Sequence, residues 1–390
     1  MSLALARFGL VVPLTCIDQS QALSIARSLA RPSEEQDTWL PGMYHGTRIQ
    51  ERHLALPQAL IRDILQGTRH SGSVYLPTDN PADRGPTTGQ RLAHYRELAP
   101  PLACEAARRA LHLAECRPEA ITHLVTVSCT GFLAPGWDRD LIVTLGLPST
   151  VERTHVGFMG CHGALNGLRV ARALVEADPT ARVLICATEL CSLHYHYSWN
   201  PQKMVANALF ADGAAAAVGM AAGLETPAET YWHLRANGAC LIPDSADAMT
   251  WTIGDHGFEM TLARSVPGLI GRYLRPFLES WLARQGLQVA TVPAWAIHPG
   301  GPKILSAVQE TLGLSEAQLA ASYSVLARYG NMSSPTLMFI LDELARLEES
   351  GPCVALGFGP GLAVEVALFE RDIASSSRWF GRVAGSQTAV

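Results

Sequence analysis

Charge is scarce in this sequence and is not concentrated in any segment. Only 17% of the 390 residues are charged, and the formal net charge is −5. No run of five or six like charges occurs, so a basic surface for nucleic acid is not indicated. An uninterrupted apolar stretch of about 18 residues, which a membrane-spanning helix needs, is also missing. We therefore expect a small-molecule partner, no nucleic acid and no membrane span.

Paired cysteines are absent too. The nine cysteines are odd in number and scattered, and no Cys-x-x-Cys pair is present. A disulfide framework or a structural zinc site would show regular pairing, so we expect reduced thiols, no metal site and a cytoplasmic protein. The apolar stretch 3–14 has a single basic residue and lacks the cleavage pattern of a secretion signal. We predict a buried strand there.

The apolar content is high and is arranged in alternating strand and helix patterns. Hydrophobic residues make up 48% of the chain, enough for a large core. Continuous apolar runs predict strands covered on both faces, at residues 124–128, 183–187, 214–218, 294–297, 354–358 and 364–369. Apolar residues at three- and four-residue spacing predict covering helices at residues 164–177, 266–285, 304–312 and 334–348. This alternation is typical of an α/β protein.

An alanine-rich stretch near the middle of the chain marks a predicted boundary. It contains Gly223 and Pro227 between a predicted strand and the next segment. We therefore predict an N-terminal half of residues 1–222 and a C-terminal half of residues 223–390. Each half ends in strand material after a helix, although no residue-level repeat is visible.

The first candidate catalytic residue is Cys161. It lies between Gly160 and Gly163, in a small-residue turn that leads into the helix predicted at 164–177. The unpaired N–H groups at a helix start favour a thiolate, the nucleophilic form of cysteine. The bare glycines leave room for a bulky substrate. The alternative is a buried structural cysteine, which is the better interpretation for most of the other eight.

The second and third candidates are His298 and Asn331. His298 ends an apolar strand and is followed by Pro-Gly-Gly-Pro, which leaves room for a ligand at the carboxyl end of the strand. Asn331 follows Gly330 in a turn before the last predicted helix. Its amide could stabilise negative charge on a carbonyl oxygen, or it could simply tolerate a left-handed turn.

The three residue types together restrict the chemistry. A thiolate accepts an acyl group as a thioester, and an imidazole and an amide stabilise the enolate formed when a malonyl thioester loses carbon dioxide. We expect His298 to hold the Cys161 thiolate as an ion pair and then to donate, with Asn331, to the thioester carbonyl. Cysteine hydrolases use the same three residue types, so the residues alone leave two reaction classes open.

From about residue 120 to residue 369 the chain resembles the type III polyketide synthases of the chalcone and stilbene synthase superfamily, in particular the bacterial members. Five family motifs occur in order, at Gly160-Cys161 and residues 208–213 (Ala-Leu-Phe-Ala-Asp-Gly), 298–302 (His-Pro-Gly-Gly-Pro), 330–334 (Gly-Asn-Met-Ser-Ser) and 357–361 (Gly-Phe-Gly-Pro-Gly). The resemblance implies a thiolase fold, five-layered αβαβα with two similar halves, and a homodimer. It implies catalysis by Cys161, His298 and Asn331, coenzyme A thioesters as substrates, and no tightly bound cofactor.

The resemblance also implies a set of cavity residues. Phe210 would guard the junction between the coenzyme A tunnel and the cavity, and ordinary core packing is the alternative role. Met260 stands where plant enzymes have a second phenylalanine, and Trp251 where they have glycine, as in relatives similar to resorcinol, pyrone or naphthalene synthases. The other cavity residues expected from the resemblance are Cys129, Cys191, His194, Ser333, Gly357, Phe358, Gly359 and Pro360.

The coenzyme A contacts are harder to assign, because the basic residues of plant members align with non-basic positions here. Arg48 and Arg52 are the proposed substitutes, with solvated surface charge as the alternative. Lys303 is a further candidate, and Leu262, Gly300 and Gly301 are expected to line the pantetheine tunnel. The methionine that plant proteins insert into the partner subunit aligns with Ala134, which leaves that contact open.

We predict an acyltransferase that loads an acyl starter from coenzyme A, extends it with malonyl-CoA and cyclises the polyketide to a resorcinol, pyrone or related product. A single-condensation ketoacyl synthase III-like enzyme shares the three catalytic residues. The loop 357–361 and Phe210 argue against it. A non-catalytic acyl-CoA-binding protein is the alternative from another class, and covalent acylation at Cys161 distinguishes it.

Overall fold

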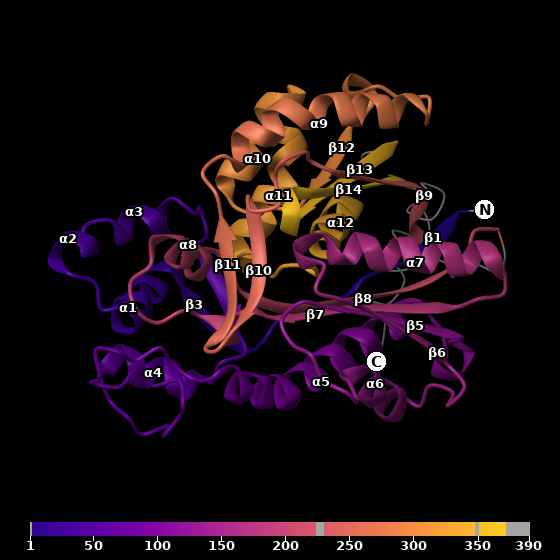
Figure 1. Ribbon diagram of the computed structural model, residues 1–390. Coiled ribbons are helices and arrows are strands. Elements are labelled where there is room, and N and C mark those ends of the chain that lie inside the picture. Colours follow the sequence, from indigo (N-terminus) through magenta and orange to yellow (C-terminus); the bar gives the residue numbers. More distant parts are fainter. Residues whose placement is uncertain (1, 224–229, 348–350, 372–390) are drawn as a thin grey trace, which may run out of the picture.

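The computed structural model describes residues 2–223, 230–347 and 351–371 (Figure 1). A ten-stranded mixed sheet runs through it, and nine of its strands follow the order β12-β13-β14-β9-β1-β8-β7-β5-β6. The tenth strand, β2, also pairs with β8, next to the part of β8 that pairs with β1. Its strands are β1 (Leu3–Ala6), β2 (Gly9–Val11), β5 (His123–Ser128), β6 (Glu152–Gly157), β7 (Val183–Leu190), β8 (Asp212–Ala221), β9 (Thr230–Leu241), β12 (Ala294–Ile297), β13 (Pro352–Gly359) and β14 (Ala363–Glu370). Two small sheets pair β3 (Thr15–Asp18) with β4 (Glu51–Leu54), and β10 (Met249–Gly254) with β11 (Gly257–Leu262).

The helices of the described residues are arranged in layers around these strands (Figure 1). They are α1 (Gln19–Ala30), α2 (Glu34–Asp37), α3 (Leu40–His45), α4 (Gln58–Gln66), α5 (Thr88–Leu113), α6 (Trp137–Leu145), α7 (Gly163–Ala177), α8 (Pro201–Leu209), α9 (Val266–Ala283), α10 (Pro302–Leu312), α11 (Glu316–Tyr329) and α12 (Thr336–Arg346). Helices α5 and α6 cover one outer face, α9 and α10 cover the other, and α7 and α12 lie between the strand layers. This confirms the layered α/β arrangement predicted from the sequence.

The central layer explains why two helices depart from simple amphipathic patterns. All residues from Thr336 to Asp342 of α12 are buried, because strands lie on both sides of this helix. Helix α7 approaches β5 so closely that a Cβ atom on Gly167 would lie 2.8 Å from a methyl carbon of Val127. This close packing fixes the first turns of α7, directly after the turn that contains Cys161.

Strand β1 connects the two predicted halves. It pairs with β8 on one side and with β9 on the other, both antiparallel. The stretch 3–14 is thus strand, as predicted, in two pieces, β1 and β2. The division at residues 222 and 223 stays a prediction, because the sheet is continuous across it.

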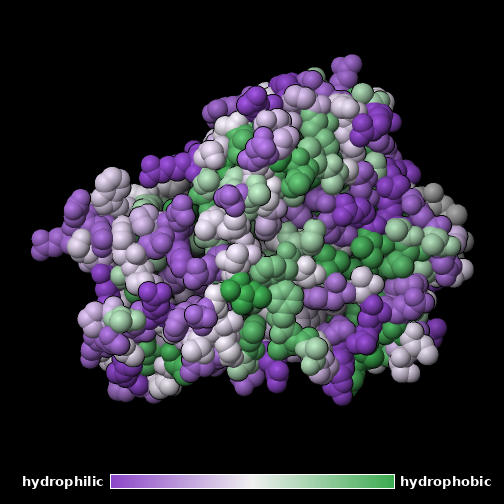
Figure 2. Space-filling model, in the orientation of Figure 1, coloured by the Kyte–Doolittle hydropathy of each residue, from purple (hydrophilic) through white to green (hydrophobic). Residues whose placement is uncertain are grey.

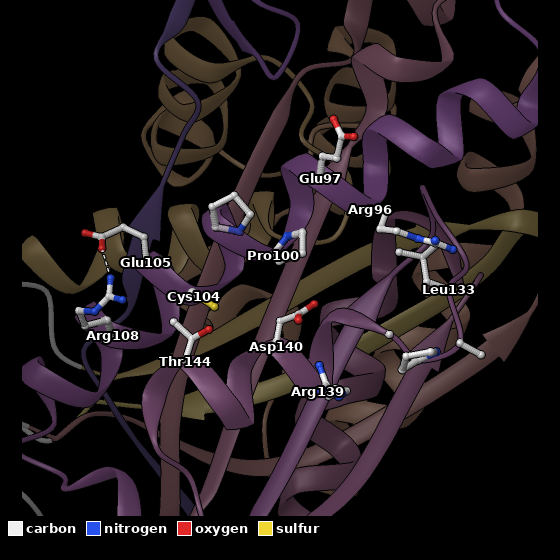
Figure 3. Close-up of a pocket in the computed structure, with 14 residues that line it drawn as sticks. Arg96, Glu97, Pro100, Cys104, Glu105, Arg108, Leu133, Arg139, Asp140 and Thr144 are labelled. Atoms are coloured by element: carbon white, nitrogen blue, oxygen red, sulfur yellow. Dashed lines mark hydrogen bonds and ion pairs between the residues drawn. The ribbon is translucent and has the colours of Figure 1, made fainter.

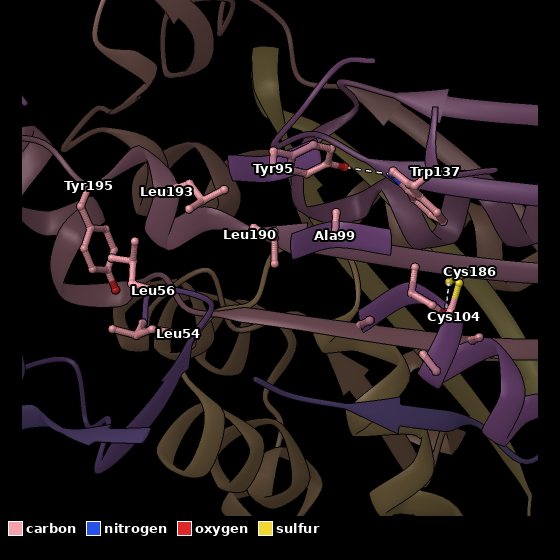
Figure 4. Packing of buried hydrophobic residues seen from close by; sticks show 14 of the residues in the cluster. Leu54, Leu56, Tyr95, Ala99, Cys104, Trp137, Cys186, Leu190, Leu193 and Tyr195 are labelled. Atoms are coloured by element: carbon pink, nitrogen blue, oxygen red, sulfur yellow. Dashed lines mark hydrogen bonds between the residues drawn. The ribbon is translucent and has the colours of Figure 1, made fainter. Parts of the chain in front are cut away.

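Buried hydrophobic side chains fill the space between the layers, and one cluster leads towards the site. Figure 4 shows this cluster, in which the indole N–H of Trp137 donates to the hydroxyl of Tyr95 at 3.0 Å. The same hydroxyl lies 2.7 Å from Oγ of Ser128, the last residue of β5. The next residue is Cys129. Among the described residues, no helix combines the length and apolarity that crossing a membrane would require.

Candidate active site

Cys161 lies in a short 3-10 turn, Gly160–His162, between β6 and α7. Gly160 has a φ of 77°, and a Cβ atom there would lie 2.5 Å from Cδ of Pro360. Only glycine fits this position without strain. The bare backbone at Gly160 therefore lets the loop 357–361 approach the nucleophile, whereas the sequence analysis expected this space to be left for a substrate.

The electrostatic setting of Cys161 differs from the prediction. Burial raises the pKa of the Cys161 thiol to about 11, although hydrogen bonds from the side chains of Ser333 and Asn331 oppose the rise. The sequence predicts that the helix start lowers the pKa of the Cys161 thiol, and this prediction is wrong for the protein without bound substrate. Desolvation of the charged form outweighs the field of the helix end.

His298 follows β12, as predicted, and its backbone N–H donates to the carbonyl oxygen of Leu356 in β13 at 2.8 Å. The side chain is 1% exposed, and neither ring nitrogen has a hydrogen-bond partner among the described residues. Burial, with a smaller contribution from His162, lowers the pKa of His298 to about 3. Both pKa shifts favour a neutral thiol and a neutral imidazole when no substrate is bound, and the ion pair between them stays a prediction.

We expect the alkylation of Cys161 by iodoacetamide to rise about tenfold per pH unit between pH 7 and 9, because the thiolate fraction grows that way well below the pKa. Peptide mass spectrometry measures this rate. The exposed Cys16, read in the same digest, serves as reference. A rate for Cys161 that is already constant from pH 7 would show that the ion pair forms before substrate binds.

Asn331 is held by both its backbone and its side chain. Its N–H donates to the carbonyl oxygen of Leu209 and its own carbonyl accepts from Ala211, both at 2.9 Å. Its side-chain oxygen accepts from the backbone N–H of Ser333 at 2.8 Å. With that oxygen occupied, the amide NH₂ group is left to act on the Cys161 thiol, whose pKa it lowers against the effect of burial. The backbone bonds also attach Asn331 to Phe210, its partner in an isolated β-bridge.

A small cavity of about 30 Å³ opens at Cys161. The hairpin β10–β11 forms one wall and contributes Met249, Thr250, Trp251 and Met260. Most of the cavity residues predicted from the sequence line it: Cys129, Cys191, Phe210, Trp251, Met260, Ser333 and Pro360. This space holds about two water molecules, which is much less than a polyketide chain occupies.

Four predicted cavity residues lie elsewhere. The His194 ring stacks on Phe258 at 4.2 Å, and its Nε2 atom lies 2.7 Å from the carbonyl oxygen of Thr130. It supports Trp251, whose ring lies edge-on to it at 6.2 Å, from behind the wall. Phe358 is buried in the core under α9. Gly357 and Gly359 face His162, the residue after the nucleophile.

Glu189, which the sequence analysis misses, connects the cavity segments. Its buried carboxylate accepts hydrogen bonds from the N–H of Cys129, from the hydroxyl of Thr130 at 2.7 Å and from the hydroxyl of Ser334 at 2.6 Å. Burial raises the pKa of Glu189, and its charge in turn helps to raise the pKa of Cys129. The sequence did contain a signal for this residue, because Glu189 is a charged residue within the apolar run of β7.

Arg52 does not occupy the setting predicted for a coenzyme A ligand. It is 1% exposed, and its Nη1 atom donates to the carbonyl oxygens of Asn207 at 2.7 Å and Phe210 at 2.9 Å. A guanidinium used in this way is not available to a phosphate. The prediction for Arg52 is therefore wrong, because the β3–β4 sheet carries it inward and it braces the Phe210 segment.

The other predicted coenzyme A residues lie where a ligand could reach them or near the catalytic loop. Arg48 is exposed and stacks over the ring of Tyr323 at 5.0 Å. Lys303 is exposed in the first turn of α10. Gly300 and Gly301 follow His298 directly, and Leu262 ends β11 half-buried.

Two family models match the chain. The N-terminal domain of the chalcone and stilbene synthases matches residues 5–222, and their C-terminal domain matches residues 233–373. The chain belongs to the chalcone and stilbene synthase family. Together with the relatives below, this confirms the activity class predicted from the sequence, a type III polyketide synthase that acts by acyl transfer.

Relatives and solved structures support this membership. The alpha-pyrone synthesis polyketide synthase-like Pks18 of Mycobacterium tuberculosis is 32% identical over 92% of this chain and 88% of its own. The 1,3,6,8-tetrahydroxynaphthalene synthase of Streptomyces peucetius is 33% identical over 77% of this chain and 80% of its own. The structure of PKS-I from the brown alga Ectocarpus siliculosus superposes with a TM-score of 0.83 at 34% identity, over 95% of this chain and 98% of the other. The thiolase-type fold is thus confirmed.

Proposed function

We propose that this synthase loads an acyl starter from coenzyme A onto Cys161, extends it with malonyl-CoA and releases a cyclised polyketide. The observation that carries the proposal is the Cys161 thiol at the wall of an apolar cavity, where Ser333 and Asn331 favour its ionised form, with the buried His298 facing the adjacent His162. Substrates enter as coenzyme A thioesters, and no tightly bound cofactor is required.

Loading begins from the neutral pair. His298 takes the proton of the Cys161 thiol while the sulfur attacks the thioester carbonyl, so the S–C bond to the enzyme forms as the bond to coenzyme A breaks. The imidazolium then gives its proton to the departing coenzyme A thiolate. The lowered pKa of His298 makes the imidazolium short-lived and favours this return of the proton.

Extension uses the same imidazole as a donor. A malonyl thioester loses carbon dioxide, and the negative charge moves to its carbonyl oxygen as an enolate. The neutral ring of His298 has one N–H and Asn331 has its amide N–H, and both can donate to that oxygen. The enolate carbon then attacks the acyl thioester, the S–C bond at Cys161 breaks, and the departing thiolate takes up a proton from solvent, which restores the neutral pair.

Coenzyme A would approach along the exposed side of these loops. We assign its phosphates to Arg48 and Lys303 and its pantetheine arm to the segment from His298 to Gly301 and to Leu262. Lys303 lies in the first turn of α10, at the positive end of the helix dipole, which favours an anion. Arg48→Ala and Lys303→Ala should each raise the KM for malonyl-CoA, and unchanged KM values in both would contradict the assignment.

Trp251 should limit product length. Its indole N–H donates to the carbonyl oxygen of Cys129 at 2.8 Å, and its ring packs 6.4 Å from that of Phe210, across the small cavity. We expect Trp251→Gly to enlarge the cavity and to shift the products towards chains with more malonyl units. Liquid chromatography with mass spectrometry measures the ratio, and Trp39→Ala, at a 63% exposed tryptophan, is the control. An unchanged ratio from folded Trp251→Gly would contradict the role.

A homodimer is also part of the proposal. A groove of about 810 Å³ lies between α5, α6 and the loop that contains Ala134, and charged residues of both signs line it, among them Arg96, Glu97, Arg139 and Asp140 (Figure 3). Phe132 in the same loop is 40% exposed, and apolar side chains also gather around the β10–β11 hairpin (Figure 2). A second subunit would cover this face.

The state of the cysteines bears on the location of the protein. All nine cysteines are free, which agrees with a cytoplasmic location.

Product analysis tests the function. Purified protein is incubated with malonyl-CoA and, in separate reactions, acetyl-, hexanoyl-, stearoyl- or coumaroyl-CoA. Pyrones, resorcinols or related polyketides from any reaction support the proposal and identify the starter. Free coenzyme A and carboxylic acid alone, from folded protein in every reaction, would overturn it.

A further inference from the structure

His162, the residue after the nucleophile, has no part in the chemistry described above. It is 1% exposed, and its Nε2 atom is buried without a hydrogen-bond partner among the described residues. An unpaired buried nitrogen destabilises a protein, and an apolar side chain would fill the same space without that penalty. A histidine at this position therefore needs an explanation beyond packing.

The other ring nitrogen begins a chain of hydrogen bonds that leads to the surface. Nδ1 of His162 lies 2.7 Å from the side-chain oxygen of Asn166, and the amide of Asn166 donates to Glu365 at 2.9 Å. Arg169 holds both oxygens of Glu365, at 3.0 and 2.8 Å. Because Asn166 must turn its NH₂ group to the carboxylate, its oxygen faces the ring, and this network assigns the hydrogen to Nδ1 of His162.

The ring itself lies against the backbone of β13. A Cβ atom on Gly359 would lie 2.3 Å from Cδ2 of His162 and 2.4 Å from its Nε2, and one on Gly357 would lie 3.0 Å from its Cβ. Two residues of the loop motif are thus glycines because His162 occupies the space. Leu356, next to Gly357, accepts the backbone N–H of His298 at 2.8 Å. His162 therefore contacts the strand that holds the catalytic histidine.

We propose that His162 is a positioning residue that sets the separation between the Cys161 thiol and the His298 imidazole. Its backbone continues directly from Cys161, and its side chain is clamped between β13 and the Asn166–Glu365–Arg169 chain. The inference rests on the proposed function, because the separation matters only if the thiol transfers its proton to His298 during acyl loading.

The surroundings argue against a proton path through His162. The titratable or charged groups that face it are Glu365 from β14, Arg169 from α7 and His298 after β12. Burial lowers the pKa of His162, so the ring stays neutral. Asn166, which links it to Glu365, carries no exchangeable charge. The arrangement holds a ring in place and does not conduct protons.

The test separates acyl loading from decarboxylation. Loading needs the thiol near the imidazole, whereas decarboxylation of malonyl-CoA needs only His298 and Asn331. We expect His162→Leu to lower kcat for polyketide formation on the order of 10- to 100-fold, with decarboxylation within about threefold of wild type. His162→Asn, which keeps a donor to Asn166, should restore kcat to within about fivefold. Arg172→Leu removes an ion pair to Glu176 on the same helix and is the matched control.

A second variant keeps the test valid if His162→Leu does not fold. Asn166→Leu leaves the ring in place and removes its anchor, and it should produce the same split between the two activities. In the double variant, kcat for polyketide formation should fall no further than in the more impaired single variant, because both substitutions break the same contact between His162 and Asn166. Equal product formation by wild type and both variants, or a parallel loss of product and decarboxylation, would overturn the inference. If wild type itself makes no polyketide, the proposed function fails instead.

Discussion

Replacing Cys161 by alanine abolishes polyketide formation and leaves decarboxylation of malonyl-CoA measurable. The thiol is the only group in the mechanism that holds the growing acyl chain, so product should fall by at least about 1,000-fold. The enolate donors, His298 and Asn331, do not depend on the sulfur. Their backbone hydrogen bonds to Leu356 and Leu209 stay in place. Mass spectrometry of product and of acetyl-CoA from the same reaction gives both rates.

Two further results make this expectation specific. Cys240→Ala removes a half-buried thiol outside the cavity and should retain both activities. Intact-protein mass spectrometry of wild type mixed with hexanoyl-CoA should show one added acyl group, which Cys161→Ala lacks. Loss of both activities in a folded Cys161→Ala protein would show that the cysteine and the His298–Asn331 pair do not act separately.

The sequence predicts the elements whose signal is local. The strands of the central sheet are continuous apolar runs because helices cover both faces, and each predicted run lies within a strand of the structure, such as β7, with all eight residues buried. The turns that carry Cys161, His298 and Asn331 are equally readable, since each depends on glycines at positions where side chains would collide or strain the backbone. Gly330, with a φ of 69°, is one of them.

Properties that depend on burial could not be predicted from the local sequence. Arg52 looks like a surface cation in the sequence, yet carbonyl oxygens and two tyrosine rings surround it in the fold. The thiol of Cys161 looks activated by a helix end, yet desolvation outweighs that field. Helix α5 contains Pro100 and Pro101 and went unpredicted, since prolines usually interrupt helices. In each case distant segments decide the outcome.

Asn331→Asp should remove the enolate donor while retaining the fold around it. The substituted side chain has the same shape, and one oxygen can still accept from the N–H of Ser333, as the amide oxygen does at 2.8 Å. The second oxygen replaces the NH₂ group and repels the developing enolate. We expect malonyl-CoA decarboxylation at pH 8 to fall on the order of 100- to 1,000-fold, the usual loss when one such donor is removed. Release of carbon dioxide measures it.

The pH dependence of this variant distinguishes a lost donor from a damaged site. Residue 331 is 1% exposed, and burial raises the pKa of a carboxyl group. As the pH falls, the introduced acid becomes protonated, its O–H can donate to the enolate oxygen, and decarboxylation should recover relative to wild type. A misfolded site would show no such recovery. Asn80→Asp, at an exposed position, controls for the added charge. If Asn331→Asp decarboxylates malonyl-CoA at the wild-type rate at pH 8, the amide is not the donor. If Cys161→Ala also retains this activity, His298 alone would stabilise the enolate.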